Sequence, residues 1–251
     1  MFKRYLSSTV TEEEWPIWRV IAIFAITLLI GLGGALFFFF GPTWKDISGD
    51  IISPTTSTRA INLEVSSTLL AIPSNYTRYG RDRRGSKRDN VELHALLPDL
   101  NGYTINQAEA FESSALSPDL LLITITRIEH NMTPNRLIDD VYQPILSKGA
   151  GGGGLDAKTG LKKSFFAKDS MYANATFYET TLRVDDSQKS PFYICVPSSN
   201  HGAWCTGRLR IGTTAQAIFR FSEEHLKDWE EINQRLSQKL SQFRADARKE
   251  N

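Results

Sequence analysis

Two cysteines are the residues whose spacing most directly predicts a chemical bond in this sequence. Cys195 and Cys205 are the only cysteines among 251 residues, and they lie on either side of the turn-like segment Pro197–Gly202. An even pair that brackets a hairpin predicts a disulfide when the segment lies outside the cytoplasm. Closing so short a loop would stabilise the fold by roughly 2–3 kcal/mol. The alternative is a pair of free, buried thiols.

The usual sequence motifs of catalytic and metal sites are missing. The chain has no G-x-S-x-G nucleophile elbow and no H-E-x-x-H zinc motif. Its four histidines are scattered and no C-x-x-C accompanies them, so we predict no metal site, no cofactor and no catalytic residue. His201, between the two cysteines, is the histidine most open to a catalytic role, but lone loop histidines are mostly solvated. The sequence therefore does not favour an enzyme.

A glycine-rich segment comes close to a phosphate-binding loop. Gly152–Thr159 departs from the pattern G-x-x-x-x-G-K-[ST] at one position, where Ala157 replaces the second glycine. The pattern also requires a preceding strand, whereas the residues before this segment have helical spacing. We therefore predict a flexible loop and no nucleotide binding.

An arginine-rich segment, Arg78–Asn90, is the densest cluster of charge. It contains six cations against two acids. Clustered cations beside a membrane are worth about 1 kcal/mol each against anionic lipid. One hypothesis is therefore contact with an anionic headgroup or cell-wall polymer through Arg81, Arg83, Arg84, Lys87 and Arg88. The favoured alternative is a solvated hairpin loop, because acids and glycines dilute the cluster.

The elements that position these residues begin with one apolar run, Val20–Phe40, which contains no charged residue and a single hydroxyl. A helix rising ~1.5 Å per residue would span roughly 31 Å over this run, about the hydrocarbon thickness of a bilayer. Trp15, Trp18 and Trp44 flank it where interfacial aromatic rings are common. We predict a transmembrane helix at residues 20–41. A cleaved signal peptide and a buried soluble helix are less favoured alternatives.

The orientation of this helix follows from the cations near its ends. Three Lys or Arg residues precede it and two follow it closely, a small excess that favours a cytoplasmic N-terminus. We therefore expect a cytoplasmic tail at 1–19 and a linker rich in Ser, Thr, Pro and Gly at 42–59. The remaining chain is expected to be periplasmic, in a single-pass inner-membrane protein with a signal anchor.

Length and charge limit the possible partners. The part of the chain after the anchor is long enough for one domain with a sizeable core, and 41% hydrophobic content agrees with this. The formal net charge is +1, which predicts no nucleic-acid partner.

Residues 60–221 are expected to form one β-rich domain. Apolar and polar residues alternate from Ile61 to Val65, and Leu120–Ile128 is rich in β-branched residues, which is typical of strands. Further strands are expected at Thr68–Ile72, Val91–Leu97, Asn174–Val184, Pro191–Val196, Ala203–Ile211 and Thr213–Phe221.

Two short helices are expected within this domain, at Ile105–Leu116 and Thr133–Leu146. The second begins with a threonine that can cap it and a proline suited to its first turn. The predicted fold class is α+β: a transmembrane helix, then a mainly antiparallel, sandwich-like β domain with two short helical insertions, and a C-terminal amphipathic helix.

The C-terminal helix is expected at 222–251, with Ser222 as its N-cap. Its apolar stripe recurs at spacings of three and four residues, like a short heptad repeat with one asparagine. The stripe, predicted as a helix interface, consists of Leu226, Trp229, Asn233, Leu236, Leu240 and Phe243. It could pack on the domain of the same chain, or it could mediate self-association or partner binding.

Three segments also resemble a known group of sequences. Leu70–Tyr76, the arginine-rich segment after it, and Leu97–Tyr103 resemble an uncharacterised family of single-pass, envelope-anchored proteins of Gram-negative bacteria. The resemblance runs from the anchor to the C-terminal helix. It implies a periplasmic domain and assigns no functional residue.

These patterns favour a protein that acts by binding. The first hypothesis is an accessory or structural subunit that sits in the lipid bilayer and binds another envelope protein or itself. The alternative is a sensor or binding module for an anionic envelope ligand. A third hypothesis, a periplasmic hydrolase without a recognisable local motif, would need a catalytic cleft assembled from distant residues.

Overall fold

The structure is a computed structural model in which the chain forms two compact units, Met1–Ser48 and Gly49–Asn251. The described residues are 16–40, 51–112, 117–129, 132–148, 153–181, 190–198 and 202–249. Residues 1–15 of the expected cytoplasmic tail and residues 42–50 of the expected linker lie outside these residues.

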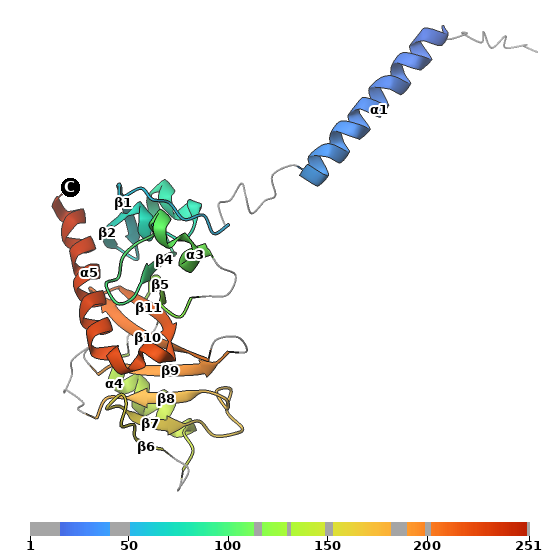
Figure 1. The fold of residues 1–251 in the computed structure, drawn as a ribbon. Helices are drawn as coiled ribbons and strands as arrows, with labels where there is room; N and C mark the ends of the chain where they lie inside the picture. The colour runs from blue at the N-terminus through green and yellow to red at the C-terminus, as the bar shows by residue number, and fades with distance from the viewer. Residues whose placement is uncertain are drawn as a thin grey trace, which may run out of the picture. The chain divides into compact units, whose positions relative to one another are not determined.

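The first unit contains helix α1, Ile17–Phe40 (Figure 1). This helix includes the whole apolar run from Val20 and begins before it. Large apolar side chains between Ile17 and Leu32 are exposed. Among the described residues we find no helix whose length and apolar character suffice for a membrane span.

The second unit is built on two β-sheets (Figure 1). The larger sheet has eight strands in the order β4-β5-β11-β10-β9-β8-β7-β6, all antiparallel to their neighbours. The smaller sheet has the order β2-β1-β3, in which β1 and β2 are antiparallel and β1 and β3 are parallel. The α+β class and the mainly antiparallel sheet predicted from the sequence are confirmed.

The strands are β1 Ala60–Val65, β2 Thr68–Pro73, β3 Ser86–Arg88, β4 Asn90–Leu96, β5 Leu120–Arg127, β6 Gly154–Leu155, β7 Lys162–Phe165, β8 Thr176–Glu179, β9 Phe192–Pro197, β10 Ala203–Ile211 and β11 Ala215–Ser222. The helical elements are the 3₁₀ turns η1 Ser74–Tyr76, η2 Gly80–Arg84, η3 Ile105–Gln107, η5 Gln143–Ile145 and η6 Glu223–Asp228, the π-helical turn η4 Leu137–Tyr142, and the α-helices α3 Ala108–Glu112, α4 Pro134–Arg136 and α5 Trp229–Lys249.

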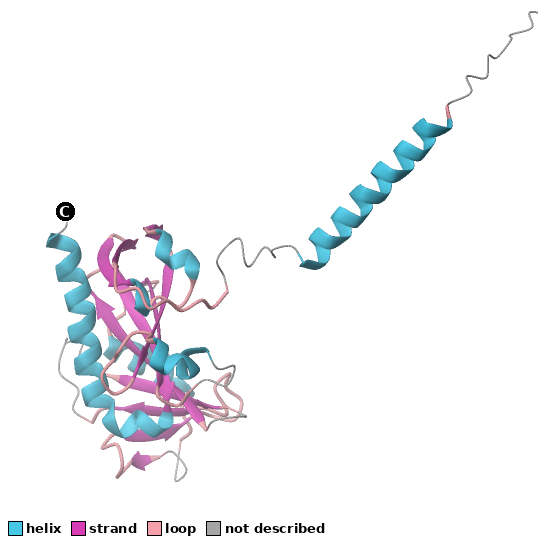
Figure 2. Cartoon of the chain, turned by 45° about the horizontal axis from the view of Figure 1, so that its top comes forward, coloured by secondary structure: helices cyan, strands magenta, loops and turns pink. Residues whose placement is uncertain are grey.

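The main core lies between the two sheets and α5. In β11, Ala215, Ala217, Phe219 and Phe221 are buried at alternate positions, because alternate side chains of a strand share one face. They pack in the same cluster as apolar residues of β1, β2 and α5. The small sheet and α5 thus cover one face of the large sheet, as Figure 2 shows for α5.

The opposite face of the large sheet is covered near its two ends. Tyr178 and Tyr193, which are paired across β8 and β9, belong to the main core. Their neighbours Phe177 and Phe192 instead pack with Tyr142 and other residues around η4. At the other end, Leu96, Tyr103, Phe111 and Leu120 form a third cluster beneath α3. The two helical insertions therefore each cover one end of this second face.

The C-terminal helix begins later than expected. Ser222 caps the segment as predicted, since its Oγ accepts a hydrogen bond from the backbone N–H of Glu224 at 3.4 Å. The residues it caps form the 3₁₀ turn η6, and the α-helix starts at Trp229. The predicted C-terminal helix is thus confirmed, with a tighter first segment.

Both helical insertions are shorter or less regular than expected. The first is a 3₁₀ turn followed by α3, which ends at Glu112 in the described residues. The second runs from Pro134 to Ile145 and passes from α-helix to π-helix to 3₁₀ turn. Pro144 lies in its last turn and cannot donate a backbone hydrogen bond there.

Candidate functional site

The two cysteines form the predicted disulfide. Cys195 in β9 and Cys205 in β10 are directly opposite each other in the ladder, with their sulfur atoms 1.96 Å apart. Both residues are buried in the main core. This bond fastens β9 to β10 and has no exposed sulfur for chemistry. His201, considered from the sequence, lies outside the described residues.

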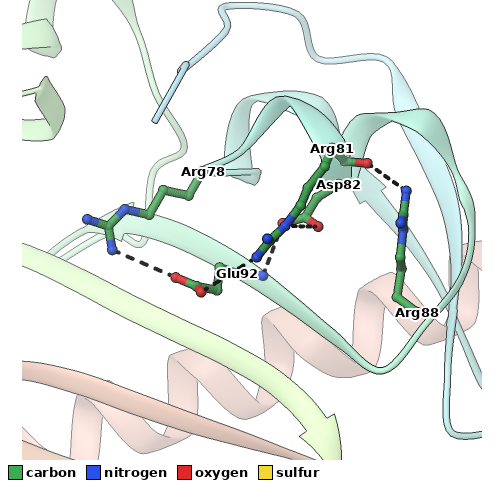
Figure 3. A network of polar contacts seen from close by, with 5 residues as sticks. All are labelled: Arg78, Arg81, Asp82, Arg88 and Glu92. Atoms are coloured by element: carbon green, nitrogen blue, oxygen red, sulfur yellow. Dashed lines mark hydrogen bonds and ion pairs between the residues drawn. The ribbon is translucent and has the colours of Figure 1, made fainter. Parts of the chain in front are cut away.

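The arginine-rich segment is occupied by contacts within the chain (Figure 3). Glu92 of β4 lies 3.9 Å from Arg78 and 4.0 Å from Arg81, measured between charged groups. Asp82 is buried, lies 3.7 Å from Arg81, and accepts a hydrogen bond from the Glu92 backbone N–H. Burial raises the pKa of the Asp82 carboxyl, against the opposing effects of that N–H and of nearby arginines. Arg88 donates to the backbone oxygen of Arg81.

The remaining cations of this segment are held in a similar way. Arg83 donates to the backbone oxygen of Ser53 at 2.6 Å and to its hydroxyl at 2.8 Å. Lys87 lies 3.8 Å from Glu64 of β1, and Arg84 ends the turn η2. Of the residues expected to contact an anionic ligand, those other than Arg84 therefore make contacts that tie η2 to β1, β4 and the start of the unit. This arrangement gives the anionic-ligand hypothesis no support.

The apolar stripe of the C-terminal helix faces the core of its own chain. Leu226, Leu236, Leu240 and Phe243 are buried there. Trp229 is partly buried against the same cluster. Of the two alternatives left by the sequence, the buried stripe corresponds to packing on the chain's own domain.

The glycine-rich segment does not form a phosphate loop in its described part. Gly154 and Leu155 form the edge strand β6. Asp156 then accepts hydrogen bonds from the backbone N–H and the hydroxyl of Thr159. The hydroxyl that a phosphate loop would use is thus engaged within the turn.

A cavity of about 700 Å³ lies beside this turn, between β8 and η6. Its walls carry both signs of charge, including Lys163 and Glu223. Tyr178 donates to Glu223 at 3.0 Å, and burial together with this carboxylate raises the pKa of the Tyr178 hydroxyl. No histidine or cysteine is among the described residues that line it.

A second cavity, of about 790 Å³, lies where β9 begins, and we call it the β10–α5 cavity. Its lining includes Arg208 and Leu209 of β10, Trp229 and Asn233 of α5, and Leu137 of the second insertion. Arg208 and Leu209 are successive residues of one strand, so their side chains lie on opposite faces of the sheet. The cavity therefore reaches both faces of the large sheet, beside the first residues of β9.

The pairing of β10 explains this opening. The β9 ladder ends at the pair Thr206–Ile194, whereas the β11 ladder continues to the pair Ile211–Ala215. The residues of β10 after Thr206 thus lie beyond its ladder with β9, and Arg208, Leu209 and Arg210 among them border the cavity. The volume is within the roughly 300–1,000 Å³ that is usual for ligand sites.

Two residues of the cavity lining each have a buried polar atom that lacks a hydrogen-bond partner among the described residues. These atoms are the Oγ of Ser190, a residue with 0% exposure, and the Oδ1 of Asn233. The other amide atom of Asn233 donates to the hydroxyl of Tyr193. Burial is the main reason that the pKa of this hydroxyl is raised. Unsatisfied buried polar atoms are uncommon and often mark a place where a ligand or water binds.

Two arginines occupy the solvent-facing side of the central strands. In the ladder between β10 and β11, Arg208 is paired with Ile218 and Arg220 is paired with Thr206. The two arginines are therefore diagonal neighbours on one face of the large sheet. Both are exposed. Neither makes an ion pair with any described residue. The two insertions cover the ends of this face and leave these positions open.

No pattern in the sequence singled out these residues. The alternation within Ala203–Ile211 places Arg208 on the face opposite Leu209, and this signal was available. Ser190 stands in a stretch without any pattern, and its position depends on the fold. No group of three or more potential metal ligands is present among the described residues.

One histidine is buried without a functional arrangement around it. His94 of β4 has 1% exposure, and its ring lies 4.7 Å from that of Phe111. Its Nε2 has no hydrogen-bond partner among the described residues. Burial, assisted by the positive charge of Arg78, lowers the pKa of His94 to about 4. This residue is a neutral part of the packing.

Comparisons with known proteins give a likeness of fold. No family model matches the chain, and no curated protein matches it. The solved structure of Smlt3025, an immunity protein of the Stenotrophomonas maltophilia type IV secretion system, has a TM-score of 0.51 at 13% identity, over 74% of this chain and 94% of that one. The iron-regulated outer membrane lipoprotein FrpD of Neisseria meningitidis has a TM-score of 0.42 at 12% identity, over 77% and 96%. At this identity the first likeness concerns the fold alone.

Proposed function

We propose that this chain is an envelope-anchored accessory protein whose folded unit binds another protein on the solvent-facing side of β10 and β11. The observation that carries the proposal is the pair Arg208 and Arg220, exposed on one face and without an ion pair among the described residues. Arginine is enriched in protein interfaces, and complementary charge selects and orients a partner. The partner surface is therefore acidic.

The fold is compatible with a binding role. The protein with the similar structure is described as an immunity protein of a type IV secretion system. A role as a binding protein requires only a folded unit with an accessible, complementary face.

The location in the periplasm and the membrane anchor are part of the same proposal. The disulfide between Cys195 and Cys205 favours an oxidising compartment. Val20–Phe40 has no charged residue, and the exposed apolar side chains of α1 form a surface that a bilayer would cover. The structure does not describe the side chains of residue 20 and of residues 34–40 in this run. The cations on its N-terminal side favour a cytoplasmic N-terminus.

The test is site-specific cross-linking in cells that carry the full chain. A photo-reactive residue at Thr206, between the two arginines on the same face, should give a cross-link to one protein partner. The double variant Arg208→Glu/Arg220→Glu should abolish that cross-link. The control Lys148→Glu/Lys168→Glu reverses the same number of charges at exposed positions elsewhere and should leave it intact.

Two results would overturn the proposal. One is an undiminished cross-link in the double arginine variant, with thermal unfolding unchanged. The other is equal loss in the arginine and lysine variants, because this would show a dependence on net charge alone. Labelling of the variant Lys168→Cys, whose new thiol would be exposed, from each side of the membrane tests the location separately.

A further inference from the structure

The β10–α5 cavity contains features that the docking face alone does not explain. It opens to both faces of the sheet, and two residues of its lining each have a buried polar atom that has no partner among the described residues. We infer that this cavity binds an extended segment of the protein partner, with one acidic side chain paired to Arg208 and with backbone N–H groups directed at Asn233 Oδ1. The inference rests on the proposed function and specifies what the partner inserts.

The polar groups determine the chemistry of the occupant. Arg208 can form a bidentate contact with a carboxylate. The Ser190 hydroxyl can donate, and its burial without a partner has a cost that an acceptor would remove. Asn233 Oδ1 can only accept, so the occupant must also bring a donor such as a backbone N–H. A single chemical class, a peptide with a carboxylate side chain, supplies all three contacts.

The charge pattern of the cavity limits the number of acidic residues. Glu129 and Glu230 also line it, together with Arg210. A run of acidic residues would therefore meet like charges, whereas one carboxylate beside Arg208 would not. The lining also contains apolar and aromatic residues, among them Phe192, Trp229 and Leu137. Apolar residues should flank the acidic residue in the bound segment.

The strand geometry favours an extended conformation. Beyond Thr206 the β9 ladder has ended, while β10 continues in register with β11. A segment that enters the cavity from either face runs alongside this part of β10. Addition of a strand at a sheet edge is a common mode of peptide recognition. Its affinity comes from backbone hydrogen bonds, and its specificity comes from alternate side chains.

The experiment selects peptides from a phage-displayed random library on the full chain in detergent micelles. Enriched peptides should contain one Asp or Glu between apolar residues. Binding of a synthetic copy, measured by fluorescence anisotropy, should weaken by at least about tenfold in Arg208→Glu. The control Lys168→Glu, which changes an exposed charge outside the cavity, should bind as the unmodified chain does.

A second variant separates cavity insertion from surface attraction. Ser237 is an exposed residue of α5 that lines the cavity, so Ser237→Trp should narrow it without changing any charge. Peptide binding should be lost in this variant while the thermal unfolding midpoint is preserved. Neutral or basic selected peptides, or binding unaffected by Ser237→Trp, would overturn the inference.

The two proposals fail in different ways. If the cellular cross-link depends on the two arginines but tolerates Ser237→Trp, the docking face stands and the inserted segment is wrong. If the cross-link is insensitive to the arginine variants, the docking face itself is wrong, and selected peptides then have no bearing on the partner.

Discussion

Asn233 of α5 donates a hydrogen bond to the hydroxyl of Tyr193 in β9. This contact connects the one polar position of an apolar helix stripe to the main core, where Tyr193 is nearly fully buried. In a coiled coil, an asparagine at such a position would fix register between helices. Here it fixes the position of α5 on the sheet, at a residue that also lines the β10–α5 cavity.

The first prediction concerns this pair. Tyr193→Phe should destabilise the folded unit by about 1–2 kcal/mol, because it leaves the amide of Asn233 without its acceptor. Asn233→Leu in the same chain should cost less than it does alone, since both polar partners are then gone. Urea unfolding of the single and double variants measures this coupling. Strictly additive losses would contradict it.

The second prediction is a loss of stability in mild acid that depends on His94. The pKa of His94 is lowered to about 4, from the ordinary value of 6.5, so the unfolded chain binds more protons than the folded chain between these values. Stability is complete above pH 6.5 and falls as the pH decreases toward 4, by up to about 3 kcal/mol in total. Urea unfolding at several pH values should show this slope.

The control for this effect is His94→Gln, which keeps a polar side chain of similar size but does not titrate. It should be less stable than the unmodified chain at pH 7 and should lose less stability between pH 6.5 and 4. If both proteins have the same pH slope, other groups cause the acid sensitivity.

The third prediction concerns the disulfide. Replacing both Cys195 and Cys205 by alanine should lower the free energy of unfolding by roughly 2–3 kcal/mol, because the closed loop restricts the unfolded chain. Reduction of the unmodified protein should lower the urea midpoint to a similar extent. A midpoint that dithiothreitol does not change, in a protein shown by mass to be reduced, would contradict the prediction.

The fourth prediction tests the packing of the C-terminal helix. Leu236 is buried at 1% exposure among residues of both sheets, so Leu236→Ala should cost about 2–5 kcal/mol. Gln238→Ala on the exposed side of the same helix should change stability little. Equal effects of the two changes on the thermal midpoint would indicate that α5 does not pack on the domain.

Local patterns in the sequence predicted several of these elements. The three- and four-residue spacing from Leu226 to Phe243 predicted an amphipathic helix, because a helix that is buried on one side has apolar residues at these spacings. The cysteine pair predicted a cross-strand bond for a similar reason, since the two residues flank a turn. Short strands such as β3 and β6 carry no such period and were not predicted.

Features that depend on distant residues could not be predicted in this way. The arginine-rich segment contains an evident excess of cations, but its partners Glu92, Glu64 and Ser53 lie outside it in sequence. The β10–α5 cavity depends on where the β9 ladder ends relative to β10. Sequence periodicity gives the approximate extent of a strand but not its register with a neighbour.

The contacts of Arg83 with Ser53 determine where a pulling force would enter the folded unit. Ser53 also donates its backbone N–H to Arg78 at 3.1 Å, and Ile52 bridges to Tyr79. Ile52 and Ser53 are thus bound to η2 and to the residues just before η2, well before the first strand of the unit begins. If these contacts are lost, as in Arg83→Ala, the next attachment of the chain is Arg59, whose backbone oxygen accepts hydrogen bonds from Ser74. The chain ahead of the folded unit would then lengthen by up to about 20 Å at ~3.3 Å per residue, so one guanidinium sets where the folded unit begins.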